Sequence, residues 1–216
     1  MDLYARIQEV SNFLSQENLA GQNLSYDPAK AGVALLVVDV QKKFCLANDT
    51  PDYGDEKTEA VAERVAALVP EFRKANIPVY LIHCSKMGVE KADEIDFYKV
   101  QPEASDTLVR KSTRSAFASS NIDEILKRNS QTKLLVCGVY LDQCVEATIR
   151  DARNKKYDIA LLEDMAENFK RSRLSKENTL QNMKDNGVLI TRSKDILAAI
   201  RAPAAQPQTT GAGMSL

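Results

Sequence analysis

The sequence predicts an α/β fold in which a parallel sheet lies between two layers of helices. Short apolar runs rich in β-branched residues alternate along the chain with segments that have the period of amphipathic helices. Apolar runs without polar alternation are typical of strands buried on both faces, as in parallel sheets. The 216 residues, of which 44% are hydrophobic and 27% charged, suit one domain of this kind.

The expected elements follow one another in strand–helix order. The expected strands are 33–39, 78–83, 107–111, 134–137, 158–162 and 187–191. The expected helices are 56–75, 121–129, a helix after Gly138, 173–185 and 194–201. Asn121 and Asp142 are the expected N-caps of the second and third of these helices. The charged, irregular segment 86–100 predicts a loop or lid.

Two extensions flank this domain. Residues 2–16 carry apolar residues at steps of three and four, which predicts an amphipathic helix that covers the domain or packs on a neighbouring subunit. The polar residues after it predict a connecting segment. We therefore divide the chain into an N-terminal helix and connector (1–30), the α/β domain (31–201) and a disordered tail (202–216) that is rich in Pro, Ala, Gln, Thr and Gly.

Charge and cysteine usage exclude several classes of protein. The net charge of -1 gives no basic field for binding nucleic acid, and no apolar run approaches the roughly 20 residues of a membrane span. The N-terminus is too polar for a secretory signal. Cysteines 45, 84, 137 and 144 form no C-x-x-C pair, so a reducing cytoplasm is expected. His83 is the single histidine, which excludes a His-rich zinc site.

Residues that carry chemistry collect at the ends of the expected strands. Asp39 ends the first strand, Lys111 ends the third, and Cys144 follows the fourth, in the first turn of the expected helix. In an open parallel sheet, ligands bind beyond the carboxyl ends of the strands. A thiol in the first turn of a helix is a candidate nucleophile, because the amides and the helix dipole there favour a thiolate.

Each candidate also has a structural interpretation. In that interpretation Cys144 is a small apolar side chain that packs its helix on the sheet, and Lys111 is a solvated surface charge. His83 and Cys84 also lie at a strand end, but neighbouring residues of a strand face opposite sides and cannot form a dyad. A pair of Cys144 and His83, oriented by Asp39, remains open on spacing alone.

Three blocks of the sequence together resemble the isochorismatase-like cysteine hydrolases. They are Val37-Val-Asp39-Val-Gln41-Lys-Lys-Phe44, then Lys111-Ser-Thr-Arg-Ser115-Ala-Phe117, then Gly138-Val-Tyr-Leu-Asp-Gln-Cys144-Val145. The likeness continues through Thr148, Asp151-Ala152, Tyr157 and Asp164 and covers roughly residues 31 to 200. It implies a three-layer α/β/α fold with a six-stranded parallel, Rossmann-like sheet. It also implies a catalytic triad of Asp39, Lys111 and Cys144.

The resemblance implies how the triad would work. Cys144 would attack a carbonyl and form a thioester, while Asp39 would accept the thiol proton. The ammonium of Lys111 would favour the ionised forms of both neighbours. Backbone N–H groups of Tyr140 and Cys144 would form the oxyanion hole, next to a cis peptide between Val139 and Tyr140. The residues expected to line the substrate pocket are Gln41, Phe44, Phe117, Tyr140 and Leu141.

Departures from the family narrow the function. Nicotinamidases of this superfamily hold a metal through an Asp-x-His motif and a further histidine, whereas the segment 48–55 here has no histidine. We therefore expect no metal and no cofactor. The retained Cys144 favours hydrolysis of an amide, ureido or carbamoyl C–N bond. Arg114 and Lys86 are available for a substrate carboxylate.

Other functions remain as alternatives. One is isochorismatase-type vinyl ether hydrolysis, which yields dihydroxy-dihydrobenzoate and pyruvate from isochorismate, and another is a non-catalytic binding or scaffold role for the same fold. The expected partners are a small-molecule substrate and further copies of the chain, with no nucleic acid and no membrane. The homo-oligomer is expected from the N-terminal helix and from the habits of the family.

Overall fold

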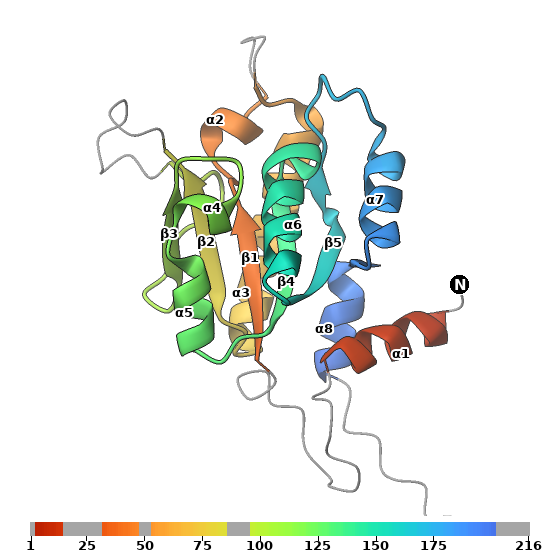
Figure 1. The fold of residues 1–216 in the computed structure, drawn as a ribbon. Helices are drawn as coiled ribbons and strands as arrows, with labels where there is room; N and C mark the ends of the chain where they lie inside the picture. Colours follow the sequence, from red (N-terminus) through yellow and green to blue (C-terminus); the bar gives the residue numbers. More distant parts are fainter. Residues whose placement is uncertain (1–2, 15–31, 48–52, 86–95, 202–216) are drawn as a thin grey trace, which may run out of the picture.

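The computed structural model describes residues 3–14, 32–47, 53–85 and 96–201. The connector 17–31, most of the segment 86–100 and the tail from residue 202 lie outside these ranges, so the predictions for them stay predictions. In the described part, a parallel sheet lies between two layers of helices (Figure 1). Its strands are β1 (Val33–Val38), β2 (Val79–Cys84), β3 (Thr107–Lys111), β4 (Lys133–Val139), β5 (Asp158–Glu167) and β6 (Leu189–Thr191).

The order of the strands confirms the predicted six-stranded, Rossmann-like sheet. The order is β3-β2-β1-β4-β5-β6, and every pairing is parallel. The chain runs outward from β1 to β3 and then returns to place β4 on the other side of β1. This reversal lies between β1 and β4, at whose carboxyl ends open α/β sheets of this kind bind ligands.

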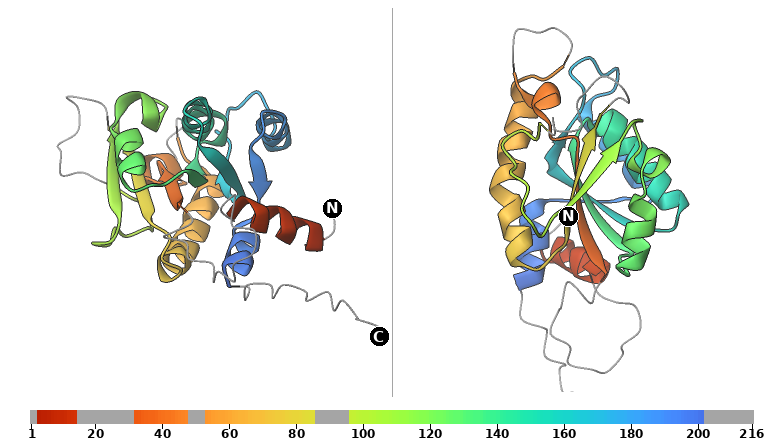
Figure 2. Two further views of the ribbon diagram at one scale, coloured as in Figure 1. Left: turned by 60° about the horizontal axis from the view of Figure 1, so that its bottom comes forward. Right: turned by 90° about the vertical axis from the view of Figure 1, so that its left-hand side faces the viewer.

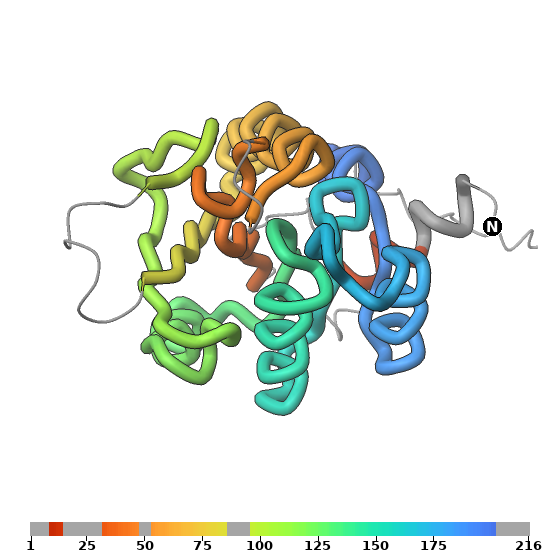
Figure 3. Tube along the Cα trace, turned by 90° about the horizontal axis from the view of Figure 1, so that it is seen from above, coloured from red at the N-terminus to blue at the C-terminus, as the bar shows by residue number. Residues whose placement is uncertain are grey.

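Helices cover both faces of the sheet, as Figure 3 shows from above the carboxyl ends of the strands. One apolar core joins the sheet to α1, α3 and α8, and a second joins it to α4, α5, α6 and α7. The helices and helical turns are α1 (Leu3–Leu14), α2 (Lys42–Cys45), α3 (Glu56–Lys74), α4 (Ala116–Ser119), α5 (Ile122–Arg128), η1 (Leu141–Val145), α6 (Glu146–Asn154), α7 (Lys176–Asp185) and α8 (Ser193–Arg201).

The N-terminal helix α1 packs against α8 of the same chain (Figure 2). Val10 and Leu14, which belong to its predicted apolar stripe, are 1% and 2% exposed in the core on that face. The predicted amphipathic helix is confirmed, and it covers its own domain. It extends the apolar core beyond the end of the sheet.

The elements differ from the expected ones mainly at their ends. The short helices α2 and α4 were not predicted, because four residues are too few to show a helical period. The strand β5 continues to Glu167 past a register shift opposite β4, through polar residues that gave no strand pattern. The strand β6 begins at Leu189, after Gly187 with a φ of 74°. Asn121 is the N-cap residue of α5, as predicted, but its side chain makes no capping bond.

Candidate active site

The fold brings the three predicted catalytic residues to one edge of the sheet. Asp39 follows β1, Lys111 ends β3, and Cys144 lies in η1 directly after β4. The ammonium of Lys111 reaches across β2 and lies 2.7 Å from Oδ2 of Asp39, and the two side chains are 0% and 1% exposed. A solvated surface lysine is therefore the wrong interpretation of Lys111.

The backbone at Asp39 is in an uncommon conformation. Its φ of 53° lies in the left-handed region, which residues with a side chain rarely adopt. Its N–H donates to the carbonyl of Ile82 at 2.9 Å, and its carbonyl accepts the N–H of Gln41 at 2.7 Å. The neighbouring strand thus holds Asp39 in a conformation of the kind found at functional sites.

Cys144 lies in a wide helical turn rather than in a regular α-helix. The turn η1 is a π-helix whose N-cap is Tyr140, and the carbonyl of Tyr140 accepts the N–H groups of Gln143 at 3.0 Å and Val145 at 3.2 Å. The prediction that Asp142 is the N-cap is wrong, because the turn begins directly after the strand. The Asp142 carboxylate instead accepts the N–H of Phe169 at 2.8 Å.

The peptide between Val139 and Tyr140 is cis, as the resemblance predicted. Just before it, Gly138 has a φ of 119° and lies opposite Val38 in the β1–β4 register. A Cβ at Gly138 would lie 2.0 Å from the carbonyl oxygen of Val38. Only glycine allows this approach, which brings the segments carrying Asp39 and Cys144 together.

Burial and charge set the protonation of the site. Burial raises the pKa of Asp39, and the charge of Lys111 opposes this effect. Burial lowers the pKa of Lys111, but the charges of Asp39 and Cys144 outweigh burial and raise it above its ordinary value. Lys111 therefore stays an ammonium, and the buried pair is held together as an ion pair.

The pKa of Cys144 corrects an expectation from the sequence. The pKa of the thiol is raised to about 12, first by burial and then by the carboxylate of Asp39, while Lys111 acts in the opposite direction. Lys111 favours the ionised form of the thiol, as expected, but burial and the nearby carboxylate outweigh the ammonium. At rest the side chain of Cys144 is therefore a thiol beside a carboxylate, and its expected thiolate does not form. That both charges act on the thiol also shows that the three side chains lie together.

The buried carboxylate of Asp39 has its close contact in the ion pair with Lys111 and makes no regular hydrogen bond besides it among the residues that the structure describes. In the described part of the chain, the buried side-chain oxygens without a regular hydrogen bond include both carboxylate oxygens of Asp39 and the hydroxyl of Ser115. The ammonium of Lys111 donates its regular hydrogen bond to the carbonyl of Thr113 at 3.0 Å, although it also forms the ion pair with Asp39. Asp39 thus keeps capacity to accept a proton, as a catalytic base requires.

The predicted pocket residue Tyr140 connects the catalytic turn to the segment after β1. Its hydroxyl donates to the carbonyl of Phe44 at 3.0 Å and accepts the N–H of Gly54 at 3.2 Å. The centroid of its ring is 6.0 Å from that of Phe44 and 5.0 Å from that of Phe169. Tyr53, which is 48% exposed, packs its edge on Phe44 at 5.6 Å. Tyr53 and Phe169 join this aromatic cluster without any signal in the sequence, because only the fold brings them together.

The predicted pocket residues Gln41, Leu141 and Phe117 are also buried. Gln41 is 2% exposed, and its side-chain carbonyl accepts the N–H of Cys84 at 2.8 Å, which ties β2 to the segment after β1. Leu141 is fully buried, and Phe117 packs on Tyr157 at a centroid distance of 5.5 Å. The contact of these three residues with a substrate stays a prediction.

The rival candidates have other surroundings. The ring of His83 is buried against Phe97 at a centroid distance of 5.9 Å. Cys84 lies beside Lys111 in the β2–β3 register. Cys45 and Cys137 are fully buried, and burial raises the pKa of both thiols. The ion pair with Lys111 makes that lysine, rather than His83, the partner that the structure gives to Asp39.

A positioning contact that the sequence did not reveal joins the second block to the helix that follows the third. The hydroxyl of Thr148, on α6, accepts the N–H of Ala116 at the start of α4 at 3.2 Å, and it is fully buried. It therefore fixes the segment after Lys111 against the helix after Cys144.

No three or more His, Cys, Asp and Glu residues of the described chain form a group that could hold a metal ion. The helices that the structure describes include none that is both long and apolar enough to cross a membrane.

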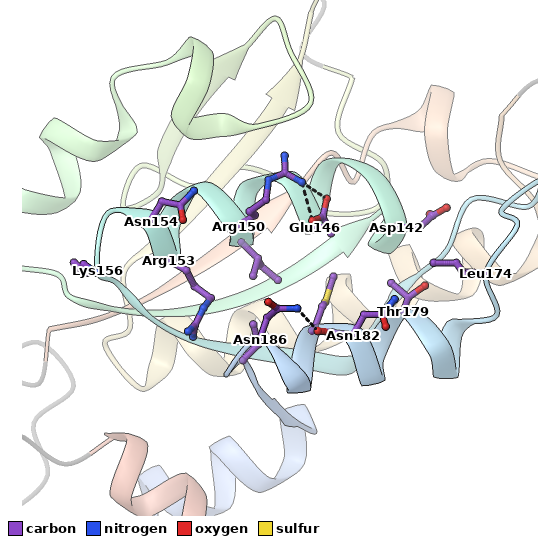
Figure 4. A pocket seen from close by; sticks show the side chains of 13 residues that line it. Asp142, Glu146, Arg150, Arg153, Asn154, Lys156, Leu174, Thr179, Asn182 and Asn186 are labelled. Atoms are coloured by element: carbon purple, nitrogen blue, oxygen red, sulfur yellow. Dashed lines mark hydrogen bonds and ion pairs between the residues drawn. The ribbon is translucent and has the colours of Figure 1, made fainter.

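A groove of about 660 Å³ lies between α6 and α7, apart from the triad (Figure 4). Asp142 lines one end of it and Lys156 the other, with the pair of Glu146 and Arg150 between them. Asp39, Lys111 and Cys144 are not among its lining residues. The groove is therefore not the catalytic crevice.

Comparisons with known proteins agree with this geometry. Residues 33–195 match the model of the isochorismatase domain. The uncharacterised isochorismatase family protein YrdC of Bacillus subtilis is 27% identical over 146 residues, which are 63% of this chain and 74% of that protein. The ureidoacrylate amidohydrolase RutB of Agrobacterium fabrum is 35% identical over 66 residues, only 31% of this chain and 29% of that protein.

The fold also matches solved structures. A cysteine hydrolase from Pseudomonas syringae pv. phaseolicola superposes with a TM-score of 0.69 at 20% identity, and the match covers 86% of this chain and 98% of that one. The family match spans most of the chain and includes the three residues that meet at the sheet edge. The chain therefore belongs to the isochorismatase family of hydrolases.

Proposed function

We propose that the protein hydrolyses a non-peptide C–N bond of a small molecule, in an amide, ureido or carbamoyl group, through a thioester on Cys144. The observation that carries this proposal is the buried ion pair of Asp39 and Lys111 beside the Cys144 thiol. A base, a fixed positive charge and a nucleophile within one water-poor crevice are the parts that acyl transfer requires.

The first half of the proposed reaction forms the thioester. Asp39 takes the proton of the Cys144 thiol as the sulfur attacks the carbonyl carbon of the substrate, and the carbonyl oxygen becomes an oxyanion. The N–H groups of Tyr140 and Cys144 donate to this oxyanion. The C–N bond then breaks, and the leaving nitrogen receives the proton held by Asp39, so an amine departs.

The second half releases the acid. Asp39 removes a proton from a water molecule, and the resulting hydroxide attacks the thioester carbonyl. The C–S bond breaks, the sulfur takes the proton back from Asp39, and a carboxylic or carbamic acid leaves. Lys111 keeps its proton throughout and stabilises the carboxylate of Asp39 each time that Asp39 gives its proton away. The raised pKa of Asp39 suits this role, because a base that must take a proton from a thiol should not be too weak.

A relative supports the choice of bond. The ureidoacrylate amidohydrolase of Agrobacterium fabrum is named for C–N cleavage, and its match includes about a third of this chain. The proposed reaction is metal-independent, in keeping with the absence of an Asp-x-His motif from a sequence that contains one histidine. We also propose that the protein acts as a homo-oligomer in the cytoplasm, which light scattering and fractionation would test.

Vinyl ether hydrolysis is the second candidate, because it needs an acid where amide hydrolysis needs a nucleophile. The observation that favours it is that burial raises the pKa of Asp39. An acid at that position would protonate the ether, and Cys144 would be dispensable.

The two functions separate in one experiment. Wild type and the variants Cys144→Ala and Lys111→Met are assayed against amides, ureides, carbamoyl compounds and isochorismate. Denatured samples of turning-over enzyme are then weighed by intact-mass spectrometry. C–N hydrolysis lost in Cys144→Ala, with an acyl mass on the wild type only, would support the proposal. Isochorismate cleavage retained in Cys144→Ala would refute it, and binding without turnover of any compound would indicate a scaffold role.

A further inference from the structure

A second lysine stands at the same edge of the sheet as the triad. Lys43, on α2, is exposed, and its ammonium lies 3.0 Å from the carbonyl oxygen of Cys84 at the end of β2. That strand end lies beside Lys111 in the β2–β3 register. Lys43 is thus fixed above the strand that separates Asp39 from Lys111.

The surroundings of Lys43 are those of a binding group. Its ammonium lies 4.9 Å from the centroid of the Phe44 ring, a predicted wall of the substrate pocket. Its charge also reaches the catalytic carboxylate, since it is among the groups that oppose the raised pKa of Asp39. The carbonyl and the aromatic ring together hold the ammonium near the mouth of the crevice.

We propose that Lys43 is a specificity-determining residue that binds a carboxylate of the substrate, so that the enzyme prefers anionic amides or ureides. The inference rests on the proposed function. Inside the crevice, Asp39 and Lys111 neutralise each other, so their pair does not attract an anion. A substrate carboxylate near Asp39 would be repelled unless a cation offset the repulsion, and Lys43 is an exposed cation at this edge whose charge acts on Asp39.

The test uses two alkylating reagents of nearly equal size, iodoacetate and iodoacetamide, of which only the first carries a carboxylate. Both are applied to the full chain at low salt, and peptide mapping measures the rate at Cys144 alone. The variants are Lys43→Gln and Lys43→Arg, with Lys42→Gln as matched control. Lys42 is the adjacent exposed lysine. Thermal unfolding of each variant reports any structural effect.

The expected result is a change in the ratio of the two rates. Lys43→Gln should lower the iodoacetate-to-iodoacetamide ratio about fivefold to tenfold, while Lys43→Arg and Lys42→Gln keep it near the wild-type value. Added salt should shrink the difference, because the attraction acts near the surface. If Lys43 only stabilised the local fold, Lys43→Gln would change the iodoacetate and iodoacetamide rates by the same factor.

Two other outcomes would overturn the inference in different ways. An equal ratio in wild type and Lys43→Gln, with Cys144 labelled by both reagents, would refute carboxylate binding by Lys43 and leave the proposed function standing. Absence of an acyl mass on Cys144 from wild type that is turning over an amide or ureide would remove the nucleophile. The proposed function and the inference would then fail together.

Discussion

The buried ion pair of Asp39 and Lys111 makes a specific prediction for Lys111→Met. Methionine keeps the length and apolar stem of lysine but removes its charge. Asp39 would then be a buried carboxylate without its ammonium, and the carbonyl of Thr113 would lose its donor. The exposures of 0% and 1% place this pair among buried ion pairs and not among surface pairs worth about 1 kcal/mol or less.

The magnitude follows from the distance. At 2.7 Å the attraction lost is about 6 kcal/mol for an effective dielectric constant of about 20, and removal of the ammonium recovers part of this as its own desolvation penalty. We expect the free energy of unfolding to fall by about 3–5 kcal/mol near neutral pH. Loss of both charges, in Asp39→Asn with Lys111→Met, should cost less than loss of Lys111 alone.

The effect should depend on pH with a definite sign. Without Lys111, burial is the largest effect on Asp39 and holds its folded pKa above the unfolded value of about 3.9. A carboxyl group whose pKa is raised in the folded state contributes stability below its unfolded pKa. This contribution is lost as the pH rises through the folded pKa. The free energy of unfolding of Lys111→Met should therefore lie further below that of wild type at about pH 8 than at about pH 5.

Urea unfolding at both pH values, followed by circular dichroism, measures this difference. A loss below about 1 kcal/mol that is the same at both pH values would refute the reasoning, because it would mean that the pair is solvated. A double variant less stable than Lys111→Met would equally contradict the account of an uncompensated buried charge.

Three further predictions concern the catalytic turn. The rate of Cys144 alkylation by iodoacetamide should keep rising about tenfold per pH unit through pH 9, because burial raises the pKa to about 12; a plateau below pH 8 would contradict this. Gly138→Ala should prevent folding of the site, since the new Cβ would meet the Val38 carbonyl at 2.0 Å; a soluble variant with wild-type melting temperature would disprove it. Tyr140→Phe should lower the free energy of unfolding by about 1–3 kcal/mol in urea titrations, because Phe44 and Gly54 each lose a hydrogen-bond partner; an unchanged midpoint would show that water replaces the hydroxyl.

The sequence was informative for features that depend on residues close together in the chain. Unbroken apolar runs such as Leu134 to Cys137 predicted buried strands, and the spacing of Val10 and Leu14 predicted a helix whose apolar face is indeed buried. The end of each strand then indicated which polar residues share an edge. This reasoning placed Asp39 and Lys111 together, and the ion pair between them confirms that placement.

Features that depend on tertiary packing were not predictable in this way. The π-helical turn that contains Cys144 begins directly after β4, with Tyr140 as its N-cap. Asp142, which the sequence suggested as the N-cap, lies inside the turn and accepts the N–H of Phe169 instead. The pKa of Cys144 depends on burial, which the identity of its neighbours does not reveal. Lys43 was overlooked because α2 has no periodic pattern, whereas the exposed basic residue Arg114 was considered from the sequence alone.

The protonated state of Cys144 has a consequence for how the protein meets oxidants. Peroxides and most thiol-directed poisons attack the thiolate, which is scarce here at neutral pH because burial and Asp39 disfavour it. The sulfur becomes a strong nucleophile only at the moment when a bound carbonyl lets Asp39 take its proton. We therefore expect peroxides and simple alkylating reagents to react slowly with the resting site, and a covalent inhibitor to react faster when it presents a carbonyl as the substrate does.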